Sequence, residues 1–474
     1  MHYKTYKTLV EMGKELGEDV SFFESIAAGI KEGLSKYLWQ EDKGFYAQFL
    51  YGRNFYVVSP RAEALGESLA ILYDVADEKK QTQILSKVPV TTFGVPVVFP
   101  QQPHQPPYHN DGIWPFVQAF WTWAGAKGRN TAVVEHGIAS MFRQAALFLT
   151  NKENLVATTG DFFGTCINSD RQLWSVAGTL AMIYRVIFGF EFQADSLLFK
   201  PFVPKSWSGE HKLSKFKYRK TVLNITLRGY GCNISKFIID GQQQISAKIG
   251  KDTEGEHEII IELDNKDPPQ EQMNLVKNHY TLRVPEVVEE SGYLKWKAID
   301  GAKSYIVLKN GERIAEIKEN TFKLSPSKTT DEYSVKAVDG QGWESYISEP
   351  LVIFPETHQI LQAVKSDAKK ELKIKVDIPE CGEYWIDFIY MNRNGPINTD
   401  NKCAIRTLKI GDKSIGKIVL PQRGPLDNAG YTNSLFVRLE KGENEISLVL
   451  TETDRNMNGV INEAYIDSIR LLRK

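Results

Sequence analysis

The sequence predicts a multidomain α + β protein, with a helical region over residues 1–190 and three all-β sandwiches after it. Apolar residues recur at helical spacing as far as Gly189, and from Glu191 onward the period shortens to the alternation typical of strands. The chain has 474 residues. A single core rarely grows that large, so we expect three or four domains.

The helical region reads as alternating buried and amphipathic helices. Ser59-Pro60 is a typical helix start, and Asn130 is a typical N-cap for a later helix. The stretch 111–126 between them is apolar almost all round, which is typical of a buried helix. This alternation predicts nested rings, in which inner helices are covered by outer ones.

Two unusually long connections interrupt the helices. Residues 88–110 are rich in proline, residues 151–168 are similar in character, and neither segment has a periodicity. Loops of this length inside a compact helical region are usually functional. Both lead into expected helix N-termini, so we expect their polar side chains to face a common opening.

The β region divides into three expected units. Residues 191–265 predict a small sandwich attached directly to the helices. Residues 280–355 and 356–474 predict two further strand-rich domains, and the charged segment 264–272, with its Pro268-Pro269 pair, predicts a linker.

Composition and charge exclude several classes of partner. The 58 basic and 59 acidic residues leave a net charge of −1, which indicates neither a nucleic-acid footprint nor an anionic-membrane partner. No apolar run is long enough to span a bilayer, and the first residues lack the features of a signal peptide. The location is therefore open; a longer natural chain with a signal would be periplasmic or extracellular.

No metal or cofactor is expected. The four cysteines match no metal spacing; Cys381 and Cys403 either pair with each other or remain thiols, and free thiols are the simpler interpretation. Residues 454–459 resemble the first half of a calcium loop, but Tyr465 occupies the closing position, where an acid is required. A tight turn is the better prediction there.

Three stretches together resemble the C-terminal part of six-hairpin (α/α-toroid) glycosidases of the family 63 and 78 type. They are Tyr108-His109-Asn110-Asp111-Gly112-Ile113-Trp114-Pro115, Ser169-Asp170-Arg171-Gln172-Leu173-Trp174-Ser175, and Phe199-Lys200-Pro201-Phe202-Val203-Pro204. The resemblance covers residues 1–262. It implies a partial (α/α)6 toroid, the C-terminal half of a six-hairpin barrel, because about half the expected helices precede the β region. An upstream N-terminal barrel half is then an implied partner and the place for the general acid.

Two weaker resemblances concern the later β units. Residues 282–355, with Trp296-Lys297-Ala298 and Tyr333-Ser334-Val335, look like a fibronectin type III module. Residues 358–474 resemble carbohydrate-binding modules with a galactose-binding-like jelly roll. In this last module we expect glycan contacts from side chains near loop ends, namely Tyr390, Asn392, Arg393 and Tyr431.

Glycoside hydrolysis needs two carboxylates flanking the scissile bond. In family 63 enzymes the glutamate that acts as general base shortly precedes a Pro-x-Thr-Gly stretch. Glu153 precedes Thr159-Gly160 at a similar distance, although Ala157 replaces the proline. The resemblance therefore implies Glu153 as the general base, with an ordinary surface glutamate as the alternative.

Other residues of the two long loops are candidates for substrate binding. Asp111, in the first turn of the expected buried helix, is either a dipole-stabilised cap or a functional carboxylate that binds a sugar hydroxyl or acts as an acid. His109 and Trp114 are candidates beside it, with a core role as the alternative for Trp114. Asp161, Asp170 and Arg171 complete the set, with turn or helix-dipole roles as the alternatives for the two acids.

The leading functional hypothesis is a glycoside hydrolase, or the C-terminal portion of one, that cleaves an oligo- or polysaccharide with inversion. The alternative is a non-catalytic glycan-binding protein with a truncated or degenerate barrel. On either hypothesis we expect an incomplete ring of helices to expose a markedly apolar surface.

Overall fold

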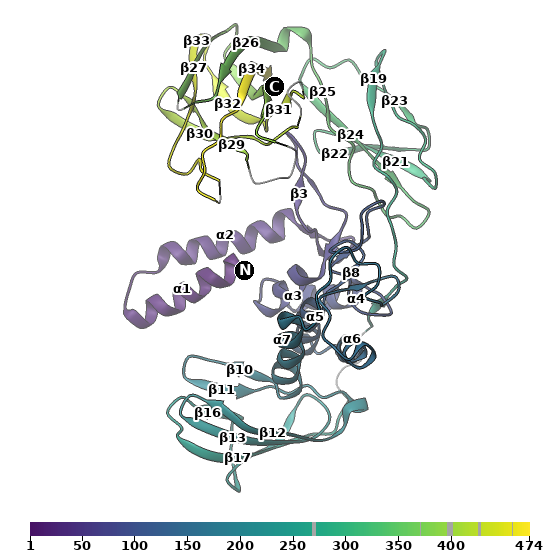
Figure 1. Cartoon of the computed structure of the whole chain (residues 1–474), viewed down its shortest axis with the longest axis vertical. Helices are drawn as coiled ribbons and strands as arrows, with labels where there is room; N and C mark the ends of the chain where they lie inside the picture. Colours follow the sequence, from purple (N-terminus) through teal and green to yellow (C-terminus); the bar gives the residue numbers. More distant parts are fainter. Residues whose placement is uncertain (268–271, 370, 396–401, 425–427, 457) are drawn as a thin grey trace. The chain divides into compact units, whose positions relative to one another are not determined.

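The computed structural model describes residues 1–267, 272–369, 371–395, 402–424, 428–456 and 458–474, and it divides into two compact units. Unit 1 comprises Met1–Leu50 and Val58–Thr281, and unit 2 comprises Tyr51–Val57 and Leu282–Lys474. Figure 1 labels many of the elements of both units. Pro268 and Pro269 of the expected linker lie outside the described residues.

Three helices of unit 1 pack around one apolar helix. This helix, α5, packs against α3, α6 and α7, and it buries Val117 and Trp121. The α1–α2 hairpin extends away from the other helices (Figure 1). The helices are α1 (His2–Leu16), α2 (Ser21–Tyr37), α3 (Ala64–Leu72), α4 (Glu78–Lys87), α5 (Pro115–Lys127), α6 (Thr131–Phe148) and α7 (Leu173–Met182), which a π-helical turn extends over Ile183–Ile187.

Short strands join the loops that precede α3 and α5. Strand β5 (Ala62–Glu63) pairs with β7 (Val98–Phe99), and β8 (Gly112–Ile113) pairs with β9 (Leu155–Val156). The Val97 backbone links the two pairs, because its N–H donates to the Gly112 carbonyl at 2.8 Å and its carbonyl accepts from Ala64 N–H at 2.9 Å. The long loops 88–110 and 151–168 are thus hydrogen-bonded into one layer. Four more short strands precede α3: β1 (Trp39–Gln40), β2 (Phe45–Tyr46), β3 (Leu50–Tyr51) and β4 (Val57–Val58).

The sandwich that follows the helices shares their core. Leu223 and Ile259 from its sheets and Ile138 and Met182 from α6 and α7 belong to one apolar cluster. This shared core explains why helices and sandwich form one unit. One sheet contains β10 (Phe190–Phe192), β11 (Ser196–Phe199) and β16 (Lys248–Gly250); the other has the order β12 (Gly209–Tyr218), β13 (Thr221–Gly229), β17 (Gly255–Leu263), β14 (Ile234–Ile239) and β15 (Gln242–Gln243), with β13 and β17 parallel.

The chain then returns from this sandwich to the long loops. Strand β18 (Asn274–Leu275) pairs in parallel with β6 (Pro89–Val90), and Gln101 N–H donates to the His279 carbonyl at 2.8 Å. This return segment, 272–281, therefore lies along the loop 88–110.

Unit 2 contains two sandwiches. The first buries Trp296, Tyr305 and Tyr333 between a three-stranded and a four-stranded sheet. Its sheets are β19 (Val288–Glu290), β20 (Tyr293–Lys295) and β23 (Thr321–Lys323), and β22 (Glu312–Ile317), β21 (Ser304–Lys309), β24 (Asp331–Val338) and β25 (Leu351–Ile353).

The second sandwich is antiparallel throughout its described pairings and buries Tyr384, Phe388 and Ile446. One sheet holds β26 (Gln359–Asp367), β34 (Tyr465–Arg473), β28 (Gly382–Met391), β31 (Gly430–Tyr431) and β32 (Leu435–Leu439). The other holds β27 (Glu371–Ile378), β33 (Gly442–Val449), β29 (Ala404–Ile410) and β30 (Lys413–Leu420). Two single-turn 3-10 helices, Lys205–Trp207 and Glu356–His358, complete the elements.

The mixed architecture of helices and β-sandwiches is confirmed, and the toroid stays a prediction. Large apolar side chains are exposed on the α1–α2 hairpin and at α7, among them Met12, Leu16, Phe22, Leu173 and Leu180. All four cysteines are free thiols. Within the described ranges, no helix is both long and apolar enough to cross a membrane.

Candidate functional site

The two carboxylates proposed for catalysis both lie buried in the joined loops of unit 1. Glu153 is 3% exposed and Asp111 is 2% exposed. They differ in their partners, which are described in turn below.

Glu153 is fixed by its backbone and by one aromatic hydroxyl. Its N–H donates to the Ser169 carbonyl at 3.0 Å, which holds residue 153 against the loop before α7. The Tyr108 hydroxyl donates to Glu153 Oε1 at 3.0 Å. Burial, followed by the hydrogen bond to Glu153, raises the pKa of Tyr108. Tyr108 therefore stays a donor at neutral pH and sets the orientation of this carboxylate.

Asp111 is an anchor for three segments. It does not lie in the first turn of a helix, as the sequence suggested, because α5 begins only at Pro115 and Asp111 has a φ of 51°. Its Oδ1 accepts from Thr158 N–H at 3.1 Å and from Asn278 Nδ2 at 2.7 Å, and its Oδ2 accepts from the Tyr280 hydroxyl at 2.5 Å. Burial, followed by the bond to Asp111, raises the pKa of Tyr280 to about 12. Within the described part of the chain, the groups that donate to this carboxylate are therefore all neutral.

A wall of aromatic rings runs beside Glu153. His109 stacks on Trp114 with ring centroids 4.9 Å apart and an interplanar angle of 14°. Trp114 Nε1 donates to the Tyr108 carbonyl at 2.9 Å, which fixes the indole. Trp174, at the start of α7, lies 5.7 Å from Trp114 and is 43% exposed. His109 and Trp174 therefore present ring surface to solvent, while Trp114 is buried behind them.

The remaining candidates of the helical region lie at the outer side of the loops. Asp161 accepts from Phe163 N–H at 3.0 Å, which is a local turn contact. Asp170 pairs with Lys152, and Arg171 is exposed with a φ of 54°. Among the residues that the structure describes, no hydrogen bond or ion pair joins these three residues to Glu153 or Asp111.

The candidates in the last sandwich divide into buried and exposed residues. Tyr390 and Asn392 are buried, and the Asn392 amide donates to the Leu420 carbonyl at 2.8 Å. Arg393 is exposed. Tyr431 is 45% exposed and covers Arg470, whose guanidinium lies 3.9 Å from the ring centroid. Of the four, Arg393 and Tyr431 are therefore available to a ligand.

Tyr431 borders a cavity of about 640 Å³ within unit 2. The Tyr51–Val57 segment contributes Arg53 and Tyr56 to its lining, and the last sandwich contributes Arg423 and Asn433. Arg53 donates to Asp387 at 2.6 Å, and Asp387 also accepts from Arg470 at 2.7 Å. Two guanidinium groups therefore share one buried carboxylate beneath Tyr431.

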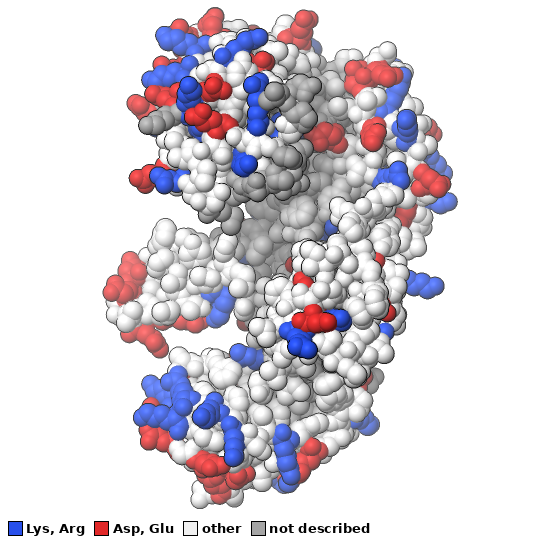
Figure 2. Space-filling view, in the orientation of Figure 1, with Lys and Arg blue, Asp and Glu red and all other residues white. Residues whose placement is uncertain are grey.

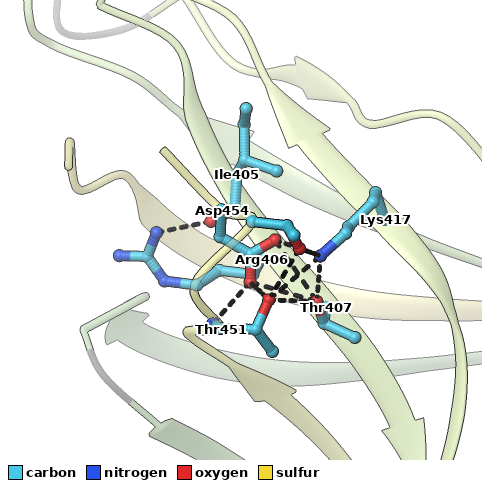
Figure 3. A network of polar contacts seen from close by, with 7 residues as sticks. Ile405, Arg406, Thr407, Lys417, Thr451 and Asp454 are labelled. Carbon is cyan, nitrogen blue, oxygen red and sulfur yellow. Dashed lines mark hydrogen bonds and ion pairs between the residues drawn. The ribbon is translucent and has the colours of Figure 1, made fainter. Parts of the chain in front are cut away.

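The loop that resembles half a calcium site holds an ammonium group in place (Figure 3). Lys417 Nζ contacts Asp454 and donates to Thr407 Oγ1 at 2.6 Å and Thr453 Oγ1 at 2.8 Å. Burial acts to raise the pKa of Asp454, but the hydrogen bonds from Lys417 and Thr451 hold it below its usual value. Gly459 N–H donates to the Asn456 carbonyl at 2.8 Å, which is a tight turn.

Charged residues of both signs are interspersed over the β-rich parts in the view of Figure 2, in keeping with the net charge of −1. Among the residues that the structure describes, no group of three or more His, Cys, Asp or Glu side chains is arranged to hold a metal ion.

Several residues of this site escaped the sequence analysis as individual candidates. Tyr108 and Trp174 lie inside the recognised stretches, and their aromatic character beside polar loops could have singled them out. Asn278 and Tyr280 had no such signal, because nothing in the sequence indicates that the segment after the expected linker returns to Asp111.

Comparisons with known proteins point to carbohydrate-binding and carbohydrate-cleaving neighbours. No protein-family model and no curated protein matches the chain. The chain is similar to the CBM35 from Cellvibrio japonicus Abf62, at 17% identity over 22% of this chain and 64% of that one, with a TM-score of 0.17. A native family 35 carbohydrate binding module from Clostridium thermocellum shows 12% identity over 25% of this chain and 89% of that one, with a TM-score of 0.18. Isomalto-dextranase from Arthrobacter globiformis T6, complexed with panose, shows 15% identity over 36% and 30%, with a TM-score of 0.18. The chain spans less than two thirds of the first and third of these.

Proposed function

We propose that this chain forms the C-terminal part of an inverting six-hairpin glycoside hydrolase that acts on an oligo- or polysaccharide, with Glu153 as the general base. The observation that carries the proposal is the hydrogen bond from Tyr108 to Glu153, because the same Tyr108 belongs to the aromatic wall with His109 and Trp114. A buried, oriented carboxylate next to ring surfaces can supply one of the two carboxyl groups that sugar hydrolysis requires.

In the proposed reaction, a sugar ring stacks on the exposed faces of His109 and Trp174. Glu153 takes a proton from a water molecule, whose oxygen attacks the anomeric carbon while the bond to the leaving oxygen breaks. The leaving oxygen receives its proton from a second carboxylic acid. Inverting enzymes hold the two carboxyl groups roughly 6.5–9.5 Å apart so that the water fits between them. We assign this acid to the proposed N-terminal barrel half.

We propose a positioning role for Asp111. Its oxygens already accept from Thr158, Asn278 and Tyr280, so a sugar hydroxyl would have to displace a protein donor. The carboxylate joins the return segment 272–281 to the loop that carries Glu153, and in this way it maintains the shape of the site.

The test combines the full chain with the proposed N-terminal barrel half that carries the acid, supplies a panel of oligosaccharides, and follows the first anomer released by NMR. The proposal expects inversion, and it expects Glu153→Gln to lose about two to four orders of magnitude in rate, because an amide cannot accept the proton from water. Release with retention of configuration would overturn the inverting mechanism.

A second candidate function is glycan binding without hydrolysis, and the cavity in unit 2 favours it. Exposed Tyr431 and Tyr56 offer ring faces, while Arg423 and Asn433 offer hydrogen-bond donors at the same cavity. In this proposal residues 356–474 act as a carbohydrate-binding module and residues 280–355 as a fibronectin type III spacer. Glycan binding that is lost in Tyr431→Ala but kept in Glu153→Gln, with no hydrolysis by the wild type, would select this function.

A further inference from the structure

A second cavity, within unit 1, is lined by a buried acid of helix α3 whose carboxyl group is only partly hydrogen-bonded. The cavity has a volume of about 290 Å³ and lies between α1, α2 and one face of α3. That face presents Glu63, Glu67, Ala70 and Tyr73 at intervals of three and four residues, which is why one side of a helix lines the space. Leu34 of α2 and Leu38, the residue after its C-terminal end, form an apolar wall.

Glu67 is buried in this cavity with one oxygen unused. It is 2% exposed, and its Oε1 accepts from Tyr46 N–H at 2.7 Å. Its Oε2 is buried and has no hydrogen-bond partner in the described part of the chain, and the same holds for Gln48 Oε1 in the same lining. Buried polar atoms without a partner are rare because desolvation is costly. Burial raises the pKa of Glu67 well above its ordinary value.

The rest of the lining is rich in tyrosine and lacks long basic side chains. Tyr3, Tyr46 and Tyr73 all border the cavity. No Lys or Arg belongs to its described lining, which includes two exposed residues, His2 and Met1, the latter with the N-terminal ammonium group. Lys80, which lies 5.9 Å from the Tyr46 ring, donates instead to Ser35 Oγ at 3.4 Å. Carboxylates, tyrosine rings and unused acceptors therefore meet in a lining whose described side chains include no Lys or Arg.

We propose that this cavity binds a compact organic ammonium ion, whose N–H groups donate to Glu67 Oε2 and Gln48 Oε1. The apolar part of the ligand would contact Leu34 and Leu38, and the tyrosine rings attract a cation through their electron-rich faces. The volume lies near the lower end of small-molecule sites, which span roughly 300–1,000 Å³. The inference stands apart from the proposed hydrolysis, because none of its residues belongs to the Glu153 site.

Calorimetric titration of the full chain with cyclohexylamine and with cyclohexanol tests the proposal, since the two probes share a ring and differ in charge. We expect one molecule of cyclohexylamine to bind per chain and cyclohexanol to bind at least about tenfold more weakly. Glu67→Gln should weaken the binding of cyclohexylamine about tenfold or more, because the charge-assisted contact is lost. Glu18→Gln, which changes an exposed carboxylate outside the lining, should leave the affinity unchanged.

A cavity-filling variant keeps the test decisive if Glu67→Gln affects folding. Ala70→Leu retains both carboxyl groups but occupies the space, and it should abolish cyclohexylamine binding while circular dichroism shows a folded chain. Equal binding of the two probes would overturn the proposal. So would no binding of cyclohexylamine, or unchanged affinity in Ala70→Leu.

Discussion

Two buried acids of unit 2 and two of unit 1 have different kinds of partner. In unit 2, Asp387 faces Arg53 and Arg470, and Asp454 faces Lys417. In unit 1, Glu153 faces a tyrosine hydroxyl, and Asp111 faces hydroxyl and amide donors. A cation neutralises the carboxylate beside it, whereas neutral donors orient a carboxylate and leave its charge in place.

This difference indicates which of the two sets of acids is available for chemistry. The paired acids of unit 2 stabilise a sandwich through closed networks, so they offer little to a ligand. Glu153 and Asp111 accept hydrogen bonds from neutral groups in loops that also expose His109 and Trp174. Buried carboxylates without a basic partner beside them are candidates for a functional site.

The largest effect is expected from breaking the closed network of Asp387. Asp387→Ala leaves two guanidinium groups without their buried carboxylate, which should lower the free energy of unfolding of unit 2 by about 3–5 kcal/mol. Urea denaturation followed by tryptophan fluorescence measures it. Asp377→Ala, at an exposed position of β27, is the matched control and should change little.

A somewhat smaller loss should follow from Asp111→Asn. The amide can accept through only one oxygen, so part of the Thr158, Asn278 and Tyr280 donor set loses its acceptor, and unit 1 should lose about 1.5–3 kcal/mol of unfolding free energy. Glu153→Gln should lose less than about 1 kcal/mol, because its amide oxygen still accepts from Tyr108. Thermal unfolding of both variants, with Asp161→Asn as control, makes the comparison; equal losses would contradict the distinction between anchor and base.

The Lys417→Met variant tests the role of the cation beside Asp454 through the pH dependence of stability. The pKa of Asp454 lies below its ordinary value in the folded state, so this carboxylate adds stability above its unfolded pKa and loses it as the pH falls through the folded pKa. Without Lys417 the folded pKa should rise, so acid unfolding should begin at a higher pH. The variant should also lose about 1–2 kcal/mol at neutral pH, because Lys417 is partly exposed. An unchanged acid midpoint in circular dichroism would contradict this reading.

A stability effect of opposite sign is expected at Glu67. Its folded pKa is raised, so the stability of the wild type is full below the unfolded pKa and falls as the pH rises toward the folded pKa. Glu67→Gln carries no such loss. In urea titrations, the free energy of unfolding of Glu67→Gln should therefore match that of the wild type near pH 4. It should exceed the wild-type value by a margin that grows toward neutral pH.

Local signals in the sequence predicted part of this fold well. Asn130 was expected as an N-cap, and its side chain accepts from Val133 N–H at the start of α6. The helix start at Ser59-Pro60 was wrong, because α3 begins at Ala64 and Glu63 caps it. The pairing of β5 with β7 explains the delay, since the chain stays extended through Glu63 before it turns into the helix.

The site itself was predictable only where its residues lie within a recognised stretch. Glu153, His109 and Trp114 came from motifs, but Asn278 reaches Asp111 across 167 residues of sequence. No periodicity encodes such a contact, because it depends on how the return segment 272–281 pairs with the loop 88–110.

The most direct test of the account compares turnover and binding in Glu153→Gln with those in Asp161→Asn, on an oligosaccharide that the wild-type chain hydrolyses, together with any upstream half of the barrel. The account predicts that Glu153→Gln loses about two to four orders of magnitude in kcat while the Kd for the same glycan changes little, and that Asp161→Asn keeps both. Wild-type turnover in Glu153→Gln would contradict the assignment of the general base.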